Sequence, residues 1–149
     1  MIYKELYELL FKTIGLFHEK FICQFRKESP QHPGIKKNHI MIIGFLYQNQ
    51  FLTATEIAKR LNMEKGSLTT LIDQLEELGM VIRSKDLNDR RKVSIFLTDA
   101  GKIEMEDMMR DSTAHMSKIL GNADPGELLK FVDSLRYAVE FMQKIKKGN

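Results

Sequence analysis

The segment from Thr53 to Gly101 constrains the fold of this chain more than any other part of the sequence. It opens with two short stretches whose apolar residues recur at helical spacing, and Asn62 supplies a turn between them. Thr53 and Glu56 have the spacing of a capping box, and Gly79 is typical of a helix C-terminus. Two apolar runs with strand-like composition follow, joined by a polar loop. This order of helix, turn, helix and hairpin predicts a winged helix-turn-helix.

The rest of the chain is mainly helical, so the expected fold class is mainly α with long N- and C-terminal helices. The expected helices are 2–25, 37–49, 53–61, 64–78, 98–121 and one that begins after Asp124; the expected strands are 81–82 and 93–97. In the last helix, apolar residues repeat at steps of four and three, which is a heptad-type seam that needs a partner helix. That partner is either a second protomer or the apolar stripe of the first helix.

Composition limits the function less than the motifs do. The 149 residues are enough for one domain or one protomer of a dimer, and the net charge of +3 is too small to indicate nucleic acid by itself. The one cysteine excludes an internal disulfide and fits a reducing cytoplasm. Because no uncharged run is long enough to span a bilayer and no cleavage site follows an apolar stretch, we expect a soluble, unprocessed, cytoplasmic protein with no membrane partner.

The polar face of the second short helix and the tip of the hairpin are the expected DNA-binding surfaces. The helix offers short side chains that can contact base edges and nearby phosphates, and the hairpin offers cations. The candidate DNA-binding residues are Lys65, Ser67, Thr69, Thr70, Gln74, Arg90, Arg91 and Lys92. For Thr69 the alternative is a hydrogen bond to its own helix, and for the hairpin cations it is an ordinary solvated turn.

Three motifs in this segment match a known family. The hairpin tip reads D-x-x-D-R-R and leads into L-T-x-x-G, matched by Asp86, Asp89, Arg90, Arg91, Leu97, Thr98 and Gly101. The first short helix reads T-x-x-E-I-A-x-x-L, matched by Thr53, Glu56, Ile57, Ala58 and Leu61. The second closes on L-E-x-x-G at Leu75, Glu76 and Gly79. With these motifs the chain resembles the MarR family of bacterial transcriptional regulators.

The resemblance implies a homodimer whose terminal helices intertwine. It divides the protomer, residues 1–149, into dimerisation helices at 1–34 and 99–149 and a winged helix-turn-helix lobe at 35–98. It also implies that one of the wing arginines enters the minor groove while Asp89 supports the hairpin by an ion pair. The chain departs from the family at Thr70 and Gln74, where many members carry arginine, so base specificity does not carry over.

The function that follows is a sequence-specific DNA-binding regulator, a homodimeric repressor relieved by a small effector. Its operator is expected to be an inverted repeat in double-stranded DNA with half-sites on the order of 10 bp apart. The resemblance also implies an aromatic or lipophilic effector, for which the candidate pocket residues are Phe11, Met41, Phe45 and Met109. The alternatives are a winged-helix module that binds a protein partner and a redox-responsive regulator that uses Cys23.

No residue pattern indicates catalysis or a cofactor. The sequence has no Ser-His-Asp order, glycine-rich phosphate loop, HExxH or paired-carboxylate motif, so we expect no enzyme activity. His18, His32, His39 and His115 lack metal-ligand spacing, and we expect no metal site. Cys23 lies between apolar neighbours with no obvious basic side chain to activate it, which favours simple packing.

Overall fold

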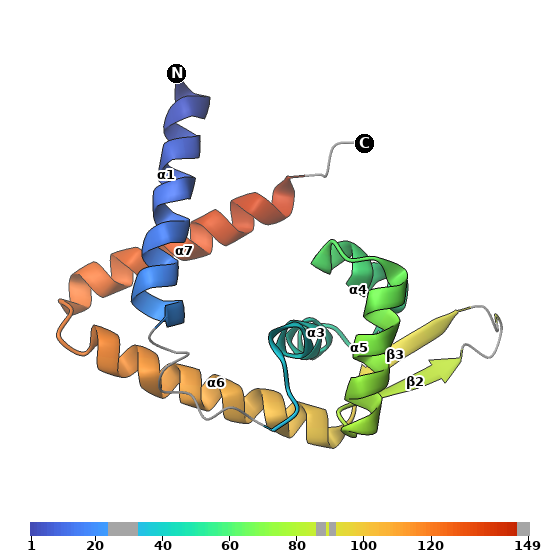
Figure 1. The fold of residues 1–149 in the computed structure, drawn as a ribbon. Coiled ribbons are helices and arrows are strands. Elements are labelled where there is room, and N and C mark those ends of the chain that lie inside the picture. The colour runs from blue at the N-terminus through green and yellow to red at the C-terminus, as the bar shows by residue number, and fades with distance from the viewer. Residues whose placement is uncertain (24–32, 86–88, 90–91, 146–149) are drawn as a thin grey trace. The chain divides into compact units, whose positions relative to one another are not determined.

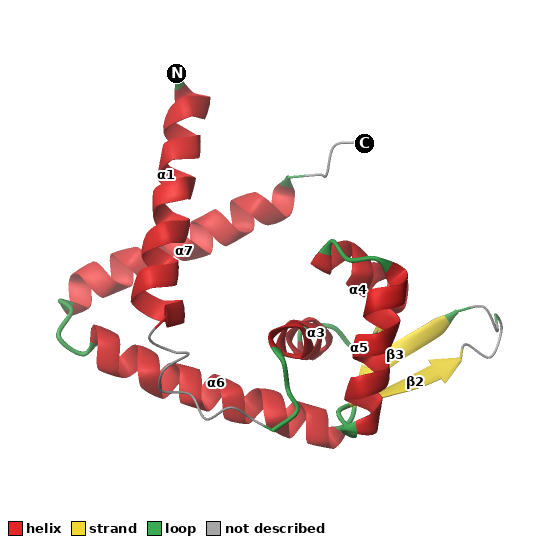
Figure 2. Ribbon diagram, viewed as in Figure 1, coloured by secondary structure: helices red, strands yellow, loops and turns green. Residues whose placement is uncertain are grey.

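The computed structural model describes residues 1–23, 33–85, 89 and 92–145, and the chain forms two compact units, residues 1–113 and 114–149. The helices are α1 (Ile2–Phe17), the π-helix η1 (His18–Ile22), α3 (Lys37–Tyr47), α4 (Ala54–Leu61), α5 (Lys65–Glu77), α6 (Asp99–Leu120) and α7 (Pro125–Lys144). The strands are β1 (Leu52–Thr53), β2 (Val81–Lys85) and β3 (Val93–Leu97) (Figures 1 and 2).

The core of the first unit is built by α3, α4, α5 and a small antiparallel sheet. The sheet has the strand order β1-β3-β2, with Leu52 opposite Ile95 and Val81 opposite Leu97. The buried apolar residues are Ile42, Ile43, Leu46, Leu52, Ile57, Ala58, Leu68, Ile72, Leu75, Val81 and Ile95. Three helices packed on a three-stranded sheet with a β2–β3 hairpin are a winged helix-turn-helix, so the predicted fold class is confirmed.

The turn between α4 and α5 follows from local chemistry. The Thr53 amide donates to Glu56 Oε2 at 2.8 Å and the Glu56 amide donates to Thr53 Oγ1 at 3.3 Å, which is the predicted capping box. Asn62 ends α4 in the left-handed conformation with φ of 50°, a conformation that asparagine tolerates better than most residues. Gly79 has φ of 72° after α5, as its position at the end of a helix predicted.

The first strand of the hairpin is longer than the sequence predicted. β2 extends from Val81 to Lys85, and its last residue pairs with Val93. The expected strand ended at Ile82 because the three residues after it are polar and carry no alternating pattern. Only one face of the hairpin packs on the core, and at this edge the backbone pairing holds the strand in place.

The first helix also differs from the prediction. The expected helix ran to about residue 25, whereas the α-helix ends at Phe17 and continues as the π-helix His18–Ile22. A π-turn raises the spacing from four to five residues, so a pattern read at helical spacing cannot reveal it.

The terminal helices bury none of their residues. This holds for all of α1 and for all of α7, whose Asp124 cap accepts a hydrogen bond from the Glu127 amide at 2.9 Å. The heptad residues Val132, Leu135, Val139 and Met142 are all exposed. The second unit consists of the end of α6, a turn through 121–124, and α7.

Candidate DNA-binding surface

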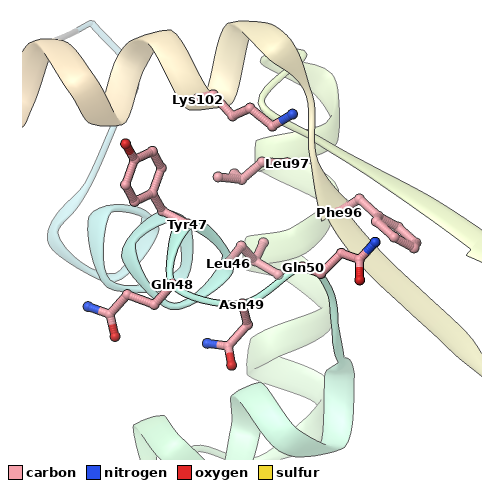
Figure 3. A pocket seen from close by; sticks show the side chains of 8 residues that line it. All are labelled: Leu46, Tyr47, Gln48, Asn49, Gln50, Phe96, Leu97 and Lys102. Carbon is pink, nitrogen blue, oxygen red and sulfur yellow. The ribbon is translucent and has the colours of Figure 1, made fainter.

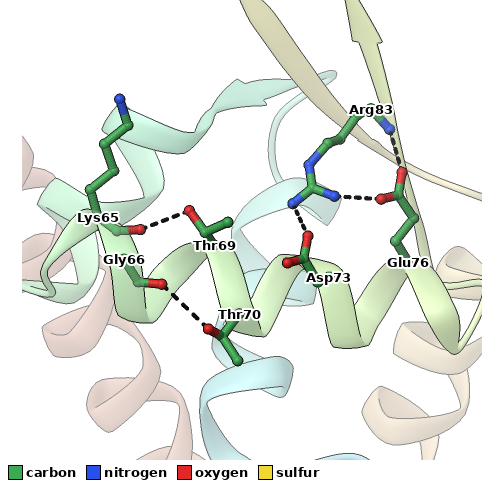
Figure 4. A network of polar contacts seen from close by, with 7 residues as sticks. All are labelled: Lys65, Gly66, Thr69, Thr70, Asp73, Glu76 and Arg83. Carbon is green, nitrogen blue, oxygen red and sulfur yellow. Dashed lines mark hydrogen bonds and ion pairs between the residues drawn. The ribbon is translucent and has the colours of Figure 1, made fainter.

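The N-terminal half of α5 presents a row of short polar side chains. Lys65, Ser67, Thr69 and Thr70 are exposed, while Leu68 on the same turns is fully buried. Thr69 donates its hydroxyl hydrogen to the Lys65 carbonyl at 2.9 Å, and Thr70 donates to the Gly66 carbonyl at 3.4 Å (Figure 4). Both hydroxyls therefore bond back to their own helix and keep their oxygen lone pairs available as acceptors.

Arg83 ties the hairpin to α5, and sequence reasoning missed it. Its guanidinium donates to Asp73 Oδ1 at 2.6 Å and to Glu76 Oε2, and its backbone amide donates to Glu76 Oε1 at 3.3 Å (Figure 4). Partial burial favours a lower pKa for Arg83, but the hydrogen bonds and charges of both carboxylates outweigh it and raise the pKa above its usual value. The signal in the sequence was an acidic pair at i, i+3 on the helix before a strand that carries an arginine.

Gln74 points into the lobe. Its Oε1 lies 3.0 Å from Nε2 of His39, a side chain of α3 that is only 1% exposed. The other ring nitrogen of His39, Nδ1, accepts a hydrogen bond from the Lys36 amide at 3.1 Å. Gln74 was a candidate for base contact on sequence grounds, and in the structure its carboxamide oxygen contacts the core histidine.

The end of β3 is fastened to the end of α5 by the L-T-x-x-G motif. The Thr98 amide donates to the Met80 carbonyl at 3.0 Å, and the Thr98 hydroxyl donates to the Gly79 carbonyl at 2.6 Å. The same hydroxyl accepts from the Gly101 amide at 3.0 Å and so caps α6. A Cβ on Gly101 would lie 2.2 Å from the Met80 carbonyl oxygen, so this contact excludes any side chain.

The tip of the hairpin is described only in part. Lys92 donates its backbone amide to the Asp89 carbonyl at 2.9 Å, and both side chains are exposed. Arg90 and Arg91, the predicted wing cations, lie outside the described residues. Their contact with DNA and the supporting role of Asp89 remain predictions.

A surface pocket of about 420 Å³ lies where the end of α3, the segment before β1, the end of β3 and the start of α6 meet (Figure 3). It is lined by Leu46, Tyr47, Gln48, Asn49, Gln50, Phe96, Leu97 and Lys102. Two of its polar groups already bond within the protein: Asn49 Nδ2 donates to the Phe45 carbonyl at 2.7 Å, and Lys102 Nζ lies 3.6 Å from Asp99 Oδ1.

None of the predicted effector-binding residues lines this pocket. Phe11, Met41 and Met109 are exposed side chains on α1, α3 and α6. The Phe45 ring lies under the guanidinium of Arg60, 5.6 Å from Cζ to the ring centroid. Their role as an effector site remains a prediction.

Cys23 has a closer basic neighbour than the sequence indicated. Its Sγ lies 3.4 Å from Nδ1 of His18, and the thiol is half-buried. The π-helix places residues i and i+5 on one face, which explains why a reading based on α-helical spacing separated them. The expectation that no basic side chain adjoins Cys23 is therefore wrong, while a redox role for it stays a prediction.

Among the described residues, no three histidine, cysteine, aspartate or glutamate side chains gather as a metal site would require. His18, His39 and His115 belong to three different elements, and His32 lies outside the described part of the chain. The described helices are all too short or too polar to cross a membrane.

Comparison with known sequences finds relatives of this part of the chain. A family model described as "MarR family" matches residues 35–93, which run from α3 through the hairpin. The repressor MdtR of Bacillus subtilis, described as an HTH-type transcriptional repressor, is 28% identical over 127 residues that cover 82% of each chain.

Solved structures agree in fold. A MarR family protein from Bacillus stearothermophilus matches with a TM-score of 0.75 at 21% identity and covers 96% of each chain. Streptococcus pneumoniae FabT, solved in complex with DNA, matches with a TM-score of 0.67 at 22% identity, over 97% of this chain and 99% of its own. Bordetella bronchiseptica BpsR, whose DNA binding is regulated by 6-hydroxynicotinic acid, matches with a TM-score of 0.63 at 19% identity, over 91% of this chain and 98% of its own.

Proposed function

This chain belongs to the MarR family, as its motifs suggested, and from that premise we propose that it is a homodimeric, sequence-specific DNA-binding regulator. In this proposal it represses transcription by occupying its operator, and a small effector molecule releases it. The observation that carries the proposal is the exposed polar half of α5, a helix that Arg83 bonds to the β2–β3 hairpin.

The chemistry of that surface suits double-stranded DNA. Helix α5 is long enough to lie in a major groove, and its exposed Ser67 and Thr70 can hydrogen-bond base edges. The start of the helix adds Lys65 and free backbone amides, which favour a phosphate. In the proposal Thr69 contacts the sugar-phosphate backbone through its hydroxyl oxygen, and Arg90, Arg91 and Lys92 reach the adjacent groove from the hairpin.

The exposed apolar stripe of α7 supports a homodimer. A heptad seam that is exposed in the protomer needs a partner helix, and a twofold dimer of the same chain is the commonest solution. Two copies of α5 related by a twofold axis require an inverted-repeat operator with half-sites on the order of 10 bp apart.

An effector relieves repression if it binds more tightly to a dimer arrangement that does not fit the operator than to the arrangement that does. A ligand that favours a dimer whose two α5 helices are wrongly spaced for the operator lowers DNA affinity by that difference in binding. BpsR, whose DNA binding responds to 6-hydroxynicotinic acid, supports a small aromatic molecule as the class of effector. Phe11, Met41, Phe45 and Met109 remain its proposed contacts.

Two further parts of the proposal rest on the regulator class. The relatives are transcriptional regulators, and we propose that this chain has no catalytic activity of its own and uses no cofactor. A regulator of bacterial transcription works where the chromosome is, so we propose the cytoplasm as its location. A winged-helix module that docks a protein, or a redox switch at Cys23, is the alternative.

Selection from a pool of random duplexes tests the proposal and does not require the operator sequence at the outset. Purified protein should enrich an inverted repeat and protect it from cleavage as a dimer. A pool that remains random after repeated rounds, at low salt and with the protein folded, would favour the protein-docking alternative.

A further inference from the structure

The hydrogen bonds of His39 fix the tautomer of its neutral ring. Its Nδ1 accepts a hydrogen bond from the Lys36 amide at 3.1 Å, so Nδ1 carries no proton and the ring proton sits on Nε2. That proton points at Gln74 Oε1, 3.0 Å away, which makes the imidazole the donor and the carboxamide oxygen the acceptor. With the side chain 1% exposed, both ring nitrogens of a neutral histidine are satisfied inside the lobe.

In this arrangement the carboxamide oxygen of Gln74 is already engaged in the hydrogen bond with His39. A glutamine that reads adenine uses its carboxamide oxygen and nitrogen together on the base edge. If Gln74 turned outward to do so, the Nε2 proton of His39 would remain buried without an acceptor. Leaving such a donor unpaired disfavours the turned-out state on the order of tenfold. Gln74 is therefore poorly suited to read a base, although it lies on the DNA-binding helix.

Two sets of hydrogen bonds, which are directional, hold α5 against the neighbouring elements of the lobe. On one side Asp73 and Glu76 bond to Arg83 of β2, and on the other Gln74 bonds to His39 of α3. Apolar packing is not directional, so a helix held by it alone can rotate slightly about its axis at little cost. Hydrogen bonds on both sides remove that freedom because they weaken steeply with angle.

We propose that Gln74 is a positioning residue, which through His39 sets the rotation of α5 and so the aim of the side chains that read DNA. The proposal rests on the proposed DNA-binding function and gives Gln74 a different role from base contact. Recognition of base edges needs side chains placed to within about 0.5 Å, so loss of this contact should affect every base position that α5 reads.

The test compares three substitutions on a duplex selected by the wild-type protein. Gln74→Met keeps the length of the side chain and removes the acceptor, Gln74→Glu keeps an acceptor for His39, and Glu77→Gln is a control at an exposed position of the same helix. Affinity is measured for the selected duplex, for each single-base-pair change and for random duplex, at a temperature where all variants are folded.

We expect Gln74→Met to lower the ratio of selective to random binding on the order of tenfold, spread over all base positions that α5 reads. Its affinity for random duplex and its salt dependence should stay as in the wild type, and Gln74→Glu should recover most of the ratio. A loss confined to one base pair would overturn the proposal, since Gln74 would then read that base. A lower melting temperature with an unchanged ratio would also overturn it, because the contact would then be structural only.

A second measurement needs neither DNA nor a variant. Nitrogen-15 NMR of the wild-type imidazole should show the neutral Nε2–H tautomer with a slowly exchanging proton, and an Nδ1–H tautomer or rapid exchange would overturn the inference. If the wild type binds all duplexes equally, the proposed function fails and the positioning role with it. If the wild type is selective and Gln74→Met is equally so, only the inference fails.

Discussion

Arg83 Nη2 lies 2.6 Å from Asp73 Oδ1, so the strand that leads to the hairpin tip is bonded to α5, the helix that we propose faces DNA. Glu76, one turn further along α5, takes the other terminal nitrogen of the same guanidinium. In the proposed function the hairpin and the helix contact DNA together, and a bond between them would fix the spacing of the two DNA-binding elements. The planar guanidinium suits this role because its nitrogens can reach two carboxylates at once.

Arg83→Gln should therefore cost both stability and DNA affinity. The charged hydrogen bonds are partly exposed, so we expect a loss of about 1–2 kcal/mol in the free energy of unfolding, measured by urea titration. Arg110→Gln is the matched control, because Arg110 pairs with Asp107 within α6 and its side chain is exposed, so stability should change by less than about 0.5 kcal/mol. Equal effects of the two substitutions would show that the bond between β2 and α5 has no special role.

Gly101→Ala should destabilise the lobe strongly. The new Cβ would lie 2.2 Å from the Met80 carbonyl oxygen, a backbone atom that cannot rotate away, so the junction of β3 with α6 must shift. Overpacking of this kind costs about 1–3 kcal/mol, which thermal unfolding can measure. Gly66→Ala is the control, because nothing lies within 4 Å of its Cβ and the helix should gain about 0.5–1 kcal/mol. A stable Gly101→Ala protein would contradict the close approach.

Acidification should remove the contribution of Glu56 to the start of α4. The hydrogen bond from the Thr53 amide, followed by that from its hydroxyl, lowers the pKa of Glu56 below 4.5, and Arg60 adds a smaller effect in the same direction. Since the pKa is lower in the folded state, the stabilisation is present above the unfolded-state pKa and is lost as the pH falls through the folded-state pKa.

The advantage of wild type over Glu56→Gln should thus be about 0.3–1 kcal/mol at neutral pH and should vanish as the pH falls through the lowered pKa of Glu56. The glutamine side chain of this variant retains the neutral part of the capping box, so the comparison isolates the charge. Urea unfolding of both proteins from pH 7 to pH 3 measures it. A difference that stays constant over this range would mean that the carboxylate charge contributes nothing.

A charge placed in the α7 seam should dissociate the dimer. Val139 is exposed in the protomer and lies in the heptad repeat, so Val139→Lys buries an ammonium group at the proposed interface. Sedimentation velocity should show a monomer for this variant and a dimer for Glu140→Lys, which adds the same side chain one position off the seam. A Val139→Lys protein that remains dimeric would place the interface elsewhere.

Local signals explain why so much of the lobe could be predicted from the sequence. The capping box at Thr53, the turn at Asn62 and the stop at Gly79 each depend on residues within four positions, and all three are confirmed. The two apolar runs around a polar loop pointed to the hairpin in the same way, and Thr98 stands where the next helix was expected to begin.

The contacts that fix the position of α5 could not be predicted from local sequence signals. Gln74 and His39 are 35 residues apart, and Asp73 and Arg83 are 10 apart, so no periodic pattern joins them. Strand β1 has only two residues and takes its conformation from pairing with β3, and the π-helix at 18–22 breaks the spacing on which helix prediction depends. These features depend on tertiary contacts or on an irregular turn.

The most direct test of the regulator proposal is fluorescence anisotropy with the selected duplex and a random duplex across a salt series. The wild type should bind the selected duplex tightly and lose affinity steeply with salt. An Arg90→Ala/Arg91→Ala variant should bind far more weakly, with a salt slope smaller by up to about 2. Wild-type binding that is weak and equal on both duplexes, or a variant that binds as tightly as the wild type, would contradict the account of this chain as a winged-helix DNA regulator.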